Sequence, residues 1–196
     1  MKILAINGSR RKHGNTGLLL KTILKPAELA GVETEQIFLG DYRIEACTGC
    51  EGCGKSWDCV IKDGFAKLIE KLDETDGIVL GSPTYWYTVT SDMKRFIDRC
   101  YSLIQFPNTR QQWIGKYQGS GKACVTAAVC EQHEGAMMGT TLTLLSDFSR
   151  DIGLELLDSV AALRCFEAGS IKQERAVLQR AKQAGEKMLQ RLQQQE

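Results

Sequence analysis

The segment KILAINGSRRKHGNT, residues 2–16, joins a short apolar run to a polar loop that leads into a helical pattern. Further apolar runs follow at Gln36–Leu39, Gly77–Gly81 and Ala123–Val129, and another is expected around Leu156–Arg164. The runs at 2–7, 77–81 and 123–129 are nearly continuous rather than alternating, which is typical of parallel strands covered on both faces. The opening segment is therefore interpreted as a strand of a buried parallel sheet, followed by its connecting helix.

Helical patterns separate these runs. Apolar residues recur at i, i+3, i+4 and i+7 in two segments, at Phe65, Leu68, Ile69 and Leu72 and at Met93, Phe96, Ile97 and Cys100. A C-terminal helix is predicted to open at Ser170–Gln173, which reads as a capping box. Alternating strands and helices predict a doubly wound α/β three-layer sandwich, with residues 1–196 in a single domain. Ligands of such sheets bind beyond the carboxyl ends of the strands.

Bulk composition excludes several function classes. The chain has 196 residues and a net charge of +1, without the basic excess typical of nucleic-acid or membrane-surface binding. Its opening lacks the apolar region of a signal peptide, and no stretch approaches the ~18 apolar residues of a membrane span. We therefore expect a cytoplasmic protein with no nucleic-acid or membrane partner. In that compartment, eight cysteines indicate metal or redox chemistry rather than disulfides.

The loop after the first run carries small polar side chains and three cations next to a helix start. Exposed backbone N–H groups and the helix dipole favour an anion at such a place, with Ser9, Asn15 and Thr16 as further donors. The loop matches neither a Walker A motif nor G-x-G-x-x-G, so it does not indicate a nucleoside triphosphate or a dinucleotide. The alternative is an ordinary polar turn with a solvated basic cluster.

The loop after the run at 77–81 reads GSPTYWYT, residues 81–88, with three consecutive aromatic residues. A flat, partly apolar ring would use their faces, although they could instead pack in a subunit interface. Because the first and this later loop should flank one crevice, an anion site beside aromatic faces predicts a mononucleotide. No Ser-His-Asp triad or carboxylate pair is assembled, so we assign no catalytic side chain.

A cysteine-rich loop at 47–59 follows the second run, with the spacing C-x2-C-x2-C-x5-C. Three closely spaced thiols and a fourth further on can hold one [4Fe–4S] cluster, with Cys47, Cys50, Cys53 and Cys59 as ligands. A structural zinc site and a redox dithiol are the alternatives. Of the other cysteines, Cys100, Cys124 and Cys165 are expected in the core, and Cys130 begins a loop at the carboxyl end of a strand.

Two stretches, NGSRRKHGNT and GSPTYWYTVTSDMKRFIDR, resemble the flavodoxin-like NADPH-dependent FMN reductase superfamily, and the cysteines between them resemble the iron–sulfur flavoproteins. The resemblance implies a five-stranded sheet in the order 2-1-3-4-5. It implies FMN with its phosphate near Ser9, Arg11, Asn15 and Thr16 and its isoalloxazine near Pro83, Thr84, Tyr85 and Trp86. A third contact loop would correspond to Ala128–Gly135. Members of the superfamily also keep similar cysteine loops without a demonstrated cluster.

These observations predict an FMN-dependent oxidoreductase or electron-transfer flavoprotein that couples FMN to a [4Fe–4S] cluster. The alternative is a cluster-free NAD(P)H-dependent FMN or quinone reductase whose cysteine loop is a dithiol or zinc site. The resemblance implies ferredoxin as an electron donor, with NAD(P)H as the other candidate, and a small molecule or protein as acceptor. We also expect a homodimer or homotetramer, with the cluster of one subunit near the FMN of its neighbour.

Overall fold

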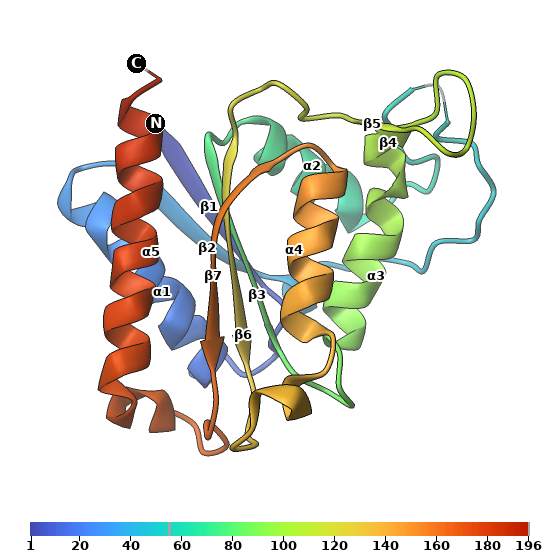
Figure 1. Ribbon diagram of the computed structural model, residues 1–196. Coiled ribbons are helices and arrows are strands. Elements are labelled where there is room, and N and C mark those ends of the chain that lie inside the picture. Colours follow the sequence, from blue (N-terminus) through green and yellow to red (C-terminus); the bar gives the residue numbers. More distant parts are fainter. Residues whose placement is uncertain (55, 196) are drawn as a thin grey trace.

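A computed structural model describes residues 1–54 and 56–195. Its central sheet has five parallel strands in the order β2-β1-β3-β6-β7 (Figure 1). The strands are β1 (Lys2–Asn7), β2 (Glu33–Phe38), β3 (Gly77–Pro83), β6 (Ala123–Val129) and β7 (Glu155–Ala162). Since β6 and β7 are the fourth and fifth strands of this sheet, the predicted order 2-1-3-4-5 is confirmed.

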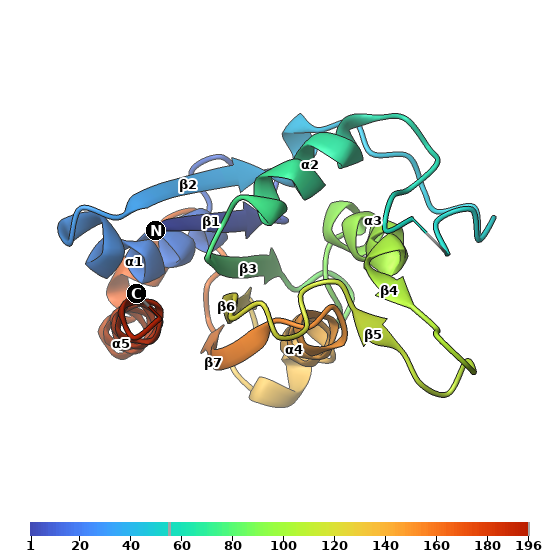
Figure 2. The ribbon, with the colours of Figure 1, turned by 90° about the horizontal axis from the view of Figure 1, so that it is seen from above.

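Helices cover both faces of the sheet, which confirms the three-layer sandwich (Figure 2). One face packs against α1 (Asn15–Leu29) and α5 (Arg175–Gln193), and the other against α2 (Gly64–Asp73), α3 (Ser91–Arg99) and α4 (Thr141–Asp151). Alternate side chains of each strand enter opposite cores. In β1, Ile3 and Ala5 pack towards α1, while Leu4 and Ile6 pack towards α2 and α3.

Short elements complete the fold. Single 3-10 turns occur at Leu39–Asp41, Cys100–Leu103, Gly135–Met138 and Ser170–Gln173. The strands β4 (Ile104–Gln105) and β5 (Ile114–Gly115) form a small antiparallel hairpin that the sequence did not predict. Among the described residues, no helix has the length and apolar character needed to cross a membrane.

Two predicted boundaries differ from the structure. Strand β2 begins at Glu33 rather than Gln36, because the edge of the sheet accepts the polar residues that precede the apolar run. The predicted capping box at Ser170–Gln173 is wrong, since α5 begins only at Arg175. The Ser170 hydroxyl instead accepts a hydrogen bond from Asn15 Nδ2 at 3.2 Å, and Glu174, with φ −86° and ψ 67°, separates the 3-10 turn from the helix.

The fold separates two groups of loops. The loops after β1, β3, β6 and β7 meet at the carboxyl end of the sheet, at the bottom of Figure 1. The segment that carries the cysteine motif lies at the right of the same view, beside the far end of α3 and the β4–β5 hairpin. The two motifs found in the sequence therefore lie in different parts of the molecule.

Candidate functional site

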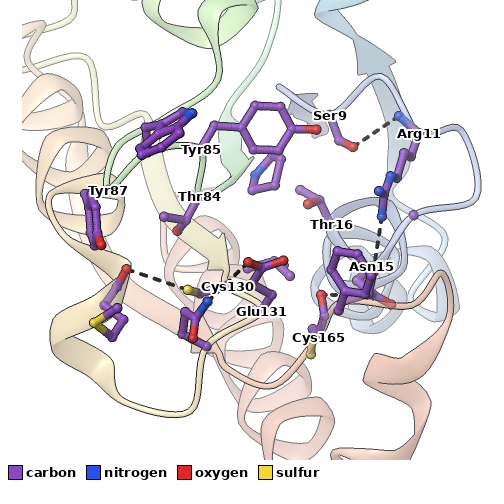
Figure 3. A pocket seen from close by; sticks show the side chains of 17 residues that line it. Ser9, Arg11, Asn15, Thr16, Thr84, Tyr85, Tyr87, Cys130, Glu131 and Cys165 are labelled. Carbon is purple, nitrogen blue, oxygen red and sulfur yellow. Dashed lines mark hydrogen bonds between the residues drawn. The ribbon is translucent and has the colours of Figure 1, made fainter.

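A cavity of about 530 Å³ lies at the carboxyl end of the sheet. All eight residues predicted to contact a mononucleotide line it, namely Ser9, Arg11, Asn15, Thr16, Pro83, Thr84, Tyr85 and Trp86 (Figure 3). Its volume lies within the range of about 300–1,000 Å³ that is usual for small-molecule sites. The predicted loops after β1 and β3 therefore form two walls of one crevice.

The anion end of this cavity is the start of α1. The first intrahelical bond runs from Leu18 N to Gly14 O, at 3.2 Å, so the N–H groups of residues 15–17 have no partner within the helix. A side chain at Gly14 would place its Cβ 2.8 Å from the Arg11 Cβ, which explains the glycine at this turn. With the hydroxyl-bearing Ser9 and Thr16 also lining the cavity, the helix start offers several donors to an anion.

Only one of the three cations in the first loop lines the cavity. Arg10 binds Asp92, with Nη2 2.9 Å from Oδ1, and thereby lowers the pKa of that carboxyl group, while Lys12 forms an ion pair with Asp41. Arg11 lines the cavity and donates from Nη1 to Phe166 O at 3.2 Å. The predicted basic cluster therefore contributes one positive charge to the cavity rather than three.

The side chain of Asn15 has a different set of contacts from the one expected. Its Nδ2 donates to Cys165 O (3.1 Å) and Glu167 O (2.8 Å) as well as to Ser170, and its Oδ1 accepts from Gly169 N (2.9 Å) and Ile171 N (3.2 Å). Asn15 thus ties the start of α1 to the loop that follows β7. Its contribution to an anion site is its backbone N–H, because its side-chain amide is already engaged.

The end of the cavity that carries the aromatic residues is a tight turn at residues 85–88. Tyr85 and Thr88 exchange backbone hydrogen bonds of 2.8 and 3.2 Å, and the two residues between them, Trp86 and Tyr87, have φ values of 48° and 64°. Such left-handed conformations are strained for bulky residues and concentrate at ligand sites. The turn is held from behind, since Thr140 N donates to Tyr87 O at 2.7 Å. Trp86 is 92% exposed, and the two tyrosines are each 51% exposed.

Other residues complete the cavity. The loop predicted at Ala128–Gly135 contributes Val129, Cys130, Glu131 and Gln132, and Met137 follows it. The loop after β7 contributes Cys165 and Phe166, and the sequence did not predict these two as site residues although this loop also follows a strand end. Cys165 is buried as expected, and burial raises its pKa to about 11, so its thiol stays protonated at neutral pH.

A second cavity, of about 370 Å³, is lined by all four cysteines of the motif, Cys47, Cys50, Cys53 and Cys59. The backbone N–H of Gly52 and then the Thr48 hydroxyl lower the pKa of Cys50, whereas burial and the neighbouring thiols raise the pKa of Cys53. Within residues 1–54 and 56–195, no three His, Cys, Asp or Glu side chains are grouped closely enough for a single metal ion. The four cysteine residues nevertheless contribute to the lining of one cavity.

The two cavities share no lining residue and lie towards opposite ends of α3. Thr90, the N-cap of α3, follows the aromatic turn, while Arg99, the last residue of the helix, lines the cysteine cavity. Nine helical residues span about 13 Å at a rise of 1.5 Å per residue. Within one chain, the cysteine cavity is therefore separated from the cavity at the carboxyl end of the sheet by the length of a helix.

Comparison with protein families gives a match over residues 1–142 to the NADPH-dependent FMN reductase model. An iron–sulfur flavoprotein from Archaeoglobus fulgidus is 38% identical over 120 residues, which cover 61% of this chain and 53% of that protein. The chain spans about half the length of the curated relatives it matches.

Solved structures show the same fold. A flavone reductase superposes with a TM-score of 0.73 at 21% identity, covering 98% of this chain and 63% of that one. A flavodoxin from the domain Archaea gives a TM-score of 0.62 at 19% identity, covering 98% and 99% of the two chains. At these identities the likeness establishes the flavodoxin-like architecture alone.

Proposed function

The chain belongs to the NADPH-dependent FMN reductase family and is an FMN flavoprotein, and from this premise we propose that it is an oxidoreductase that also carries a four-cysteine [4Fe–4S] cluster. One observation carries the proposal. Two separate cavities are lined respectively by all eight residues expected at the flavin and by all four cysteines of the motif. When bound, FMN would exchange electrons in pairs or singly and the cluster would exchange them singly.

The residues of the larger cavity suit FMN. The N–H groups at the start of α1 with the Ser9 and Thr16 hydroxyls would hold the phosphate, and Arg11 would balance part of its charge. The aromatic turn would cover the ring, with Tyr85 and Trp86 supplying flat apolar surface. The open, exposed outer side of this turn leaves room for a donor such as NAD(P)H to reach the ring from solvent.

The donor set of the smaller cavity suits an iron–sulfur cluster. Thiolates are the usual ligands of [4Fe–4S] clusters, and the four cysteines of the motif all line this cavity. The N–H of Gly52 points to the Cys50 sulfur, which favours its thiolate form. The electron donor is proposed to be ferredoxin or NAD(P)H, and the acceptor a small molecule or a protein.

We further propose an assembly of at least two chains that brings the two cofactors together. Exposed apolar side chains gather in two places: a ring patch (Tyr85, Trp86, Tyr87 and Phe166) at the flavin cavity and a hairpin patch (Trp113 and Ile114) near the cysteine segment. The ion pair of Arg110 with Glu51, at 2.9 Å, joins the hairpin connection to that segment. In a two-fold dimer, the ring patch of one chain can pack on the hairpin patch of the other, so that cluster and flavin would meet across the interface.

The proposal is tested by anaerobic purification followed by flavin, iron, sulfide and zinc analysis. We expect one FMN and about four irons and four sulfides per chain. Cys50→Ala should abolish the cluster and leave FMN bound, while Cys124→Ala, which alters a buried strand residue outside both cavities, should keep both. Stoichiometric zinc without sulfide would instead support the cluster-free reductase.

A further inference from the structure

The largest fully buried side chain in the described structure is that of a cation, Arg99. Burying an isolated guanidinium is unfavourable unless its charge is paired and its donors are satisfied. Arg99 forms a bidentate ion pair with Asp63, with Nη1 2.7 Å from Oδ2 and Nη2 3.2 Å from Oδ1. Its guanidinium also lies 4.7 Å from the centre of the Phe65 ring. The charge is therefore firmly held in one position.

Two further donors of Arg99 hold the ends of the cysteine segment. Nη1 donates to Glu45 O at 2.9 Å, two residues before Cys47, and Nη2 donates to Ile61 O at 3.1 Å, two residues after Cys59. A guanidinium has five N–H groups, and these contacts engage four of them. The fifth, on Nε, points to Cys59 Sγ at a distance of 3.2 Å. Each donor of Arg99 thus has a defined acceptor, and one acceptor is a sulfur of the motif.

We propose that Arg99 is a positioning and tuning residue for the metal centre, in which the Nε–H of a buried, permanently charged guanidinium donates to the sulfur of Cys59. This inference rests on the proposed cluster. Hydrogen bonds to ligand sulfurs and nearby charge set the reduction potential of iron–sulfur sites. Because reduction adds negative charge to the cluster, the Nε–H that Arg99 donates to Cys59 Sγ stabilises the reduced form more than the oxidised form, even though Asp63 balances the formal charge of the guanidinium. Arg99 therefore raises the potential of the cluster.

Two variants distinguish the hydrogen bond from Arg99 to Cys59 Sγ from the other contacts by which Arg99 supports the fold. R99Q/D63N removes the cation together with its counter-ion, so that no unpaired charge remains buried. D63N alone weakens the anchoring of Arg99 but keeps its Nε donor. Neither residue lines the flavin cavity, so retained FMN reports that each variant is folded.

The measurement is an anaerobic redox titration of the cluster, followed by electron paramagnetic resonance. In R99Q/D63N we expect the equilibrium constant for one-electron reduction to fall about tenfold, a shift of about 59 mV to lower potential. In D63N the potential should stay at or above the wild-type value. If the reduction potential falls by the same amount in both variants, Arg99 only holds the cysteine segment in place, and the proposal is overturned.

A second measurement needs no variant. Wild-type protein labelled with ¹⁵N-arginine should show a magnetic coupling between an arginine nitrogen and the reduced cluster in pulsed electron paramagnetic resonance. A wild-type protein that holds a cluster but shows no such coupling would overturn this inference and leave the proposed function intact. A wild-type protein that holds no cluster after anaerobic reconstitution would overturn both.

Discussion

At the scale of single residues, Ser9 and Thr16 give a test of where the phosphate binds. Both line the flavin cavity beside the start of α1, and the Ser9 hydroxyl, which accepts a hydrogen bond from Arg11 N, keeps its own proton to donate. Hydrogen bonds to a charged group contribute about 1.5–3 kcal/mol, or roughly tenfold or more in affinity. The double variant S9A/T16V should therefore weaken FMN at least tenfold and riboflavin much less, as measured by fluorescence titration. If the affinities for FMN and riboflavin fall equally, the phosphate binds elsewhere.

Asn15 should behave differently from its neighbour Thr16. Its side chain makes five hydrogen bonds to the loop after β7, and replacing it leaves buried polar groups there without partners. N15A should lower the free energy of unfolding by about 1–3 kcal/mol in urea denaturation of the flavin-free protein. T16V is the matched control and should change that stability by less. If N15A is as stable as T16V, the hydrogen bonds of the Asn15 side chain to that loop do not contribute measurably to the free energy of unfolding.

Asp63 gives a prediction for acid pH. Burial opposes its ionised form, but hydrogen bonds from Arg99, Glu45 N and Phe65 N outweigh burial and lower its pKa. A carboxylate with a lowered folded-state pKa stabilises the fold above its unfolded pKa of about 3.9, and this contribution is lost as the pH falls through the folded value. Between pH 6 and pH 3, wild-type protein should therefore lose more stability in urea unfolding than D63N. An equal loss in both proteins would contradict the assignment.

At the scale of elements, the aromatic turn between β3 and α3 combines strain with exposure. Trp86 adopts a left-handed conformation that costs a non-glycine residue about 1–2 kcal/mol, and its side chain makes little contact within the chain. W86G should raise the stability of the flavin-free protein by about 1 kcal/mol and weaken FMN binding. W86A shares the loss of the ring but keeps the strain, so it should weaken FMN without the gain in stability. Calorimetry of both variants with and without FMN checks this.

The strands and loops also show which parts of the fold can be predicted from the sequence. Continuous apolar runs identified β1, β3 and β6, because buried parallel strands leave little room for polar residues. The start of β2 was missed, since the polar residues Glu33–Glu35 carry no such signal at a sheet edge. The loops that line the cavity were predicted because they follow strand ends. The contacts of Asn15 and Arg99 were not, because they depend on residues distant in the sequence that only the folded chain brings near.

At the scale of the whole molecule, the ring patch and the hairpin patch, both exposed and apolar, predict self-association. W113E places a charge in the hairpin patch and should shift the protein towards monomer in sedimentation velocity at low micromolar concentration. L29E is the control, because Leu29 is also an exposed apolar residue (73%) but lies at the end of α1, outside both patches. A wild-type protein that is already monomeric would contradict the proposed interface.

Mixing two defective chains tests whether the cofactors meet across that interface. C50A should lack the cluster, and S9A/T16V should bind little FMN. If electrons pass between cofactors of different chains, the mixture should recover cluster-to-flavin transfer that neither variant has alone. Full transfer in a stable monomer would rule out the arrangement.

Arg99 donates hydrogen bonds to the backbone carbonyls of both Glu45 and Ile61, and this affects how much the segment between them can vary in length. The cysteine segment is anchored at both ends by one side chain, and of its four cysteines Cys59 packs against the core of the sandwich. Doubling the length of such a closed loop costs only about 0.6 kcal/mol. Segments of different lengths and cysteine spacings can then be accommodated between the two residues that Arg99 holds. A change in the length of this segment would therefore leave its two ends held at Arg99, while a change at Cys59 would also alter the core.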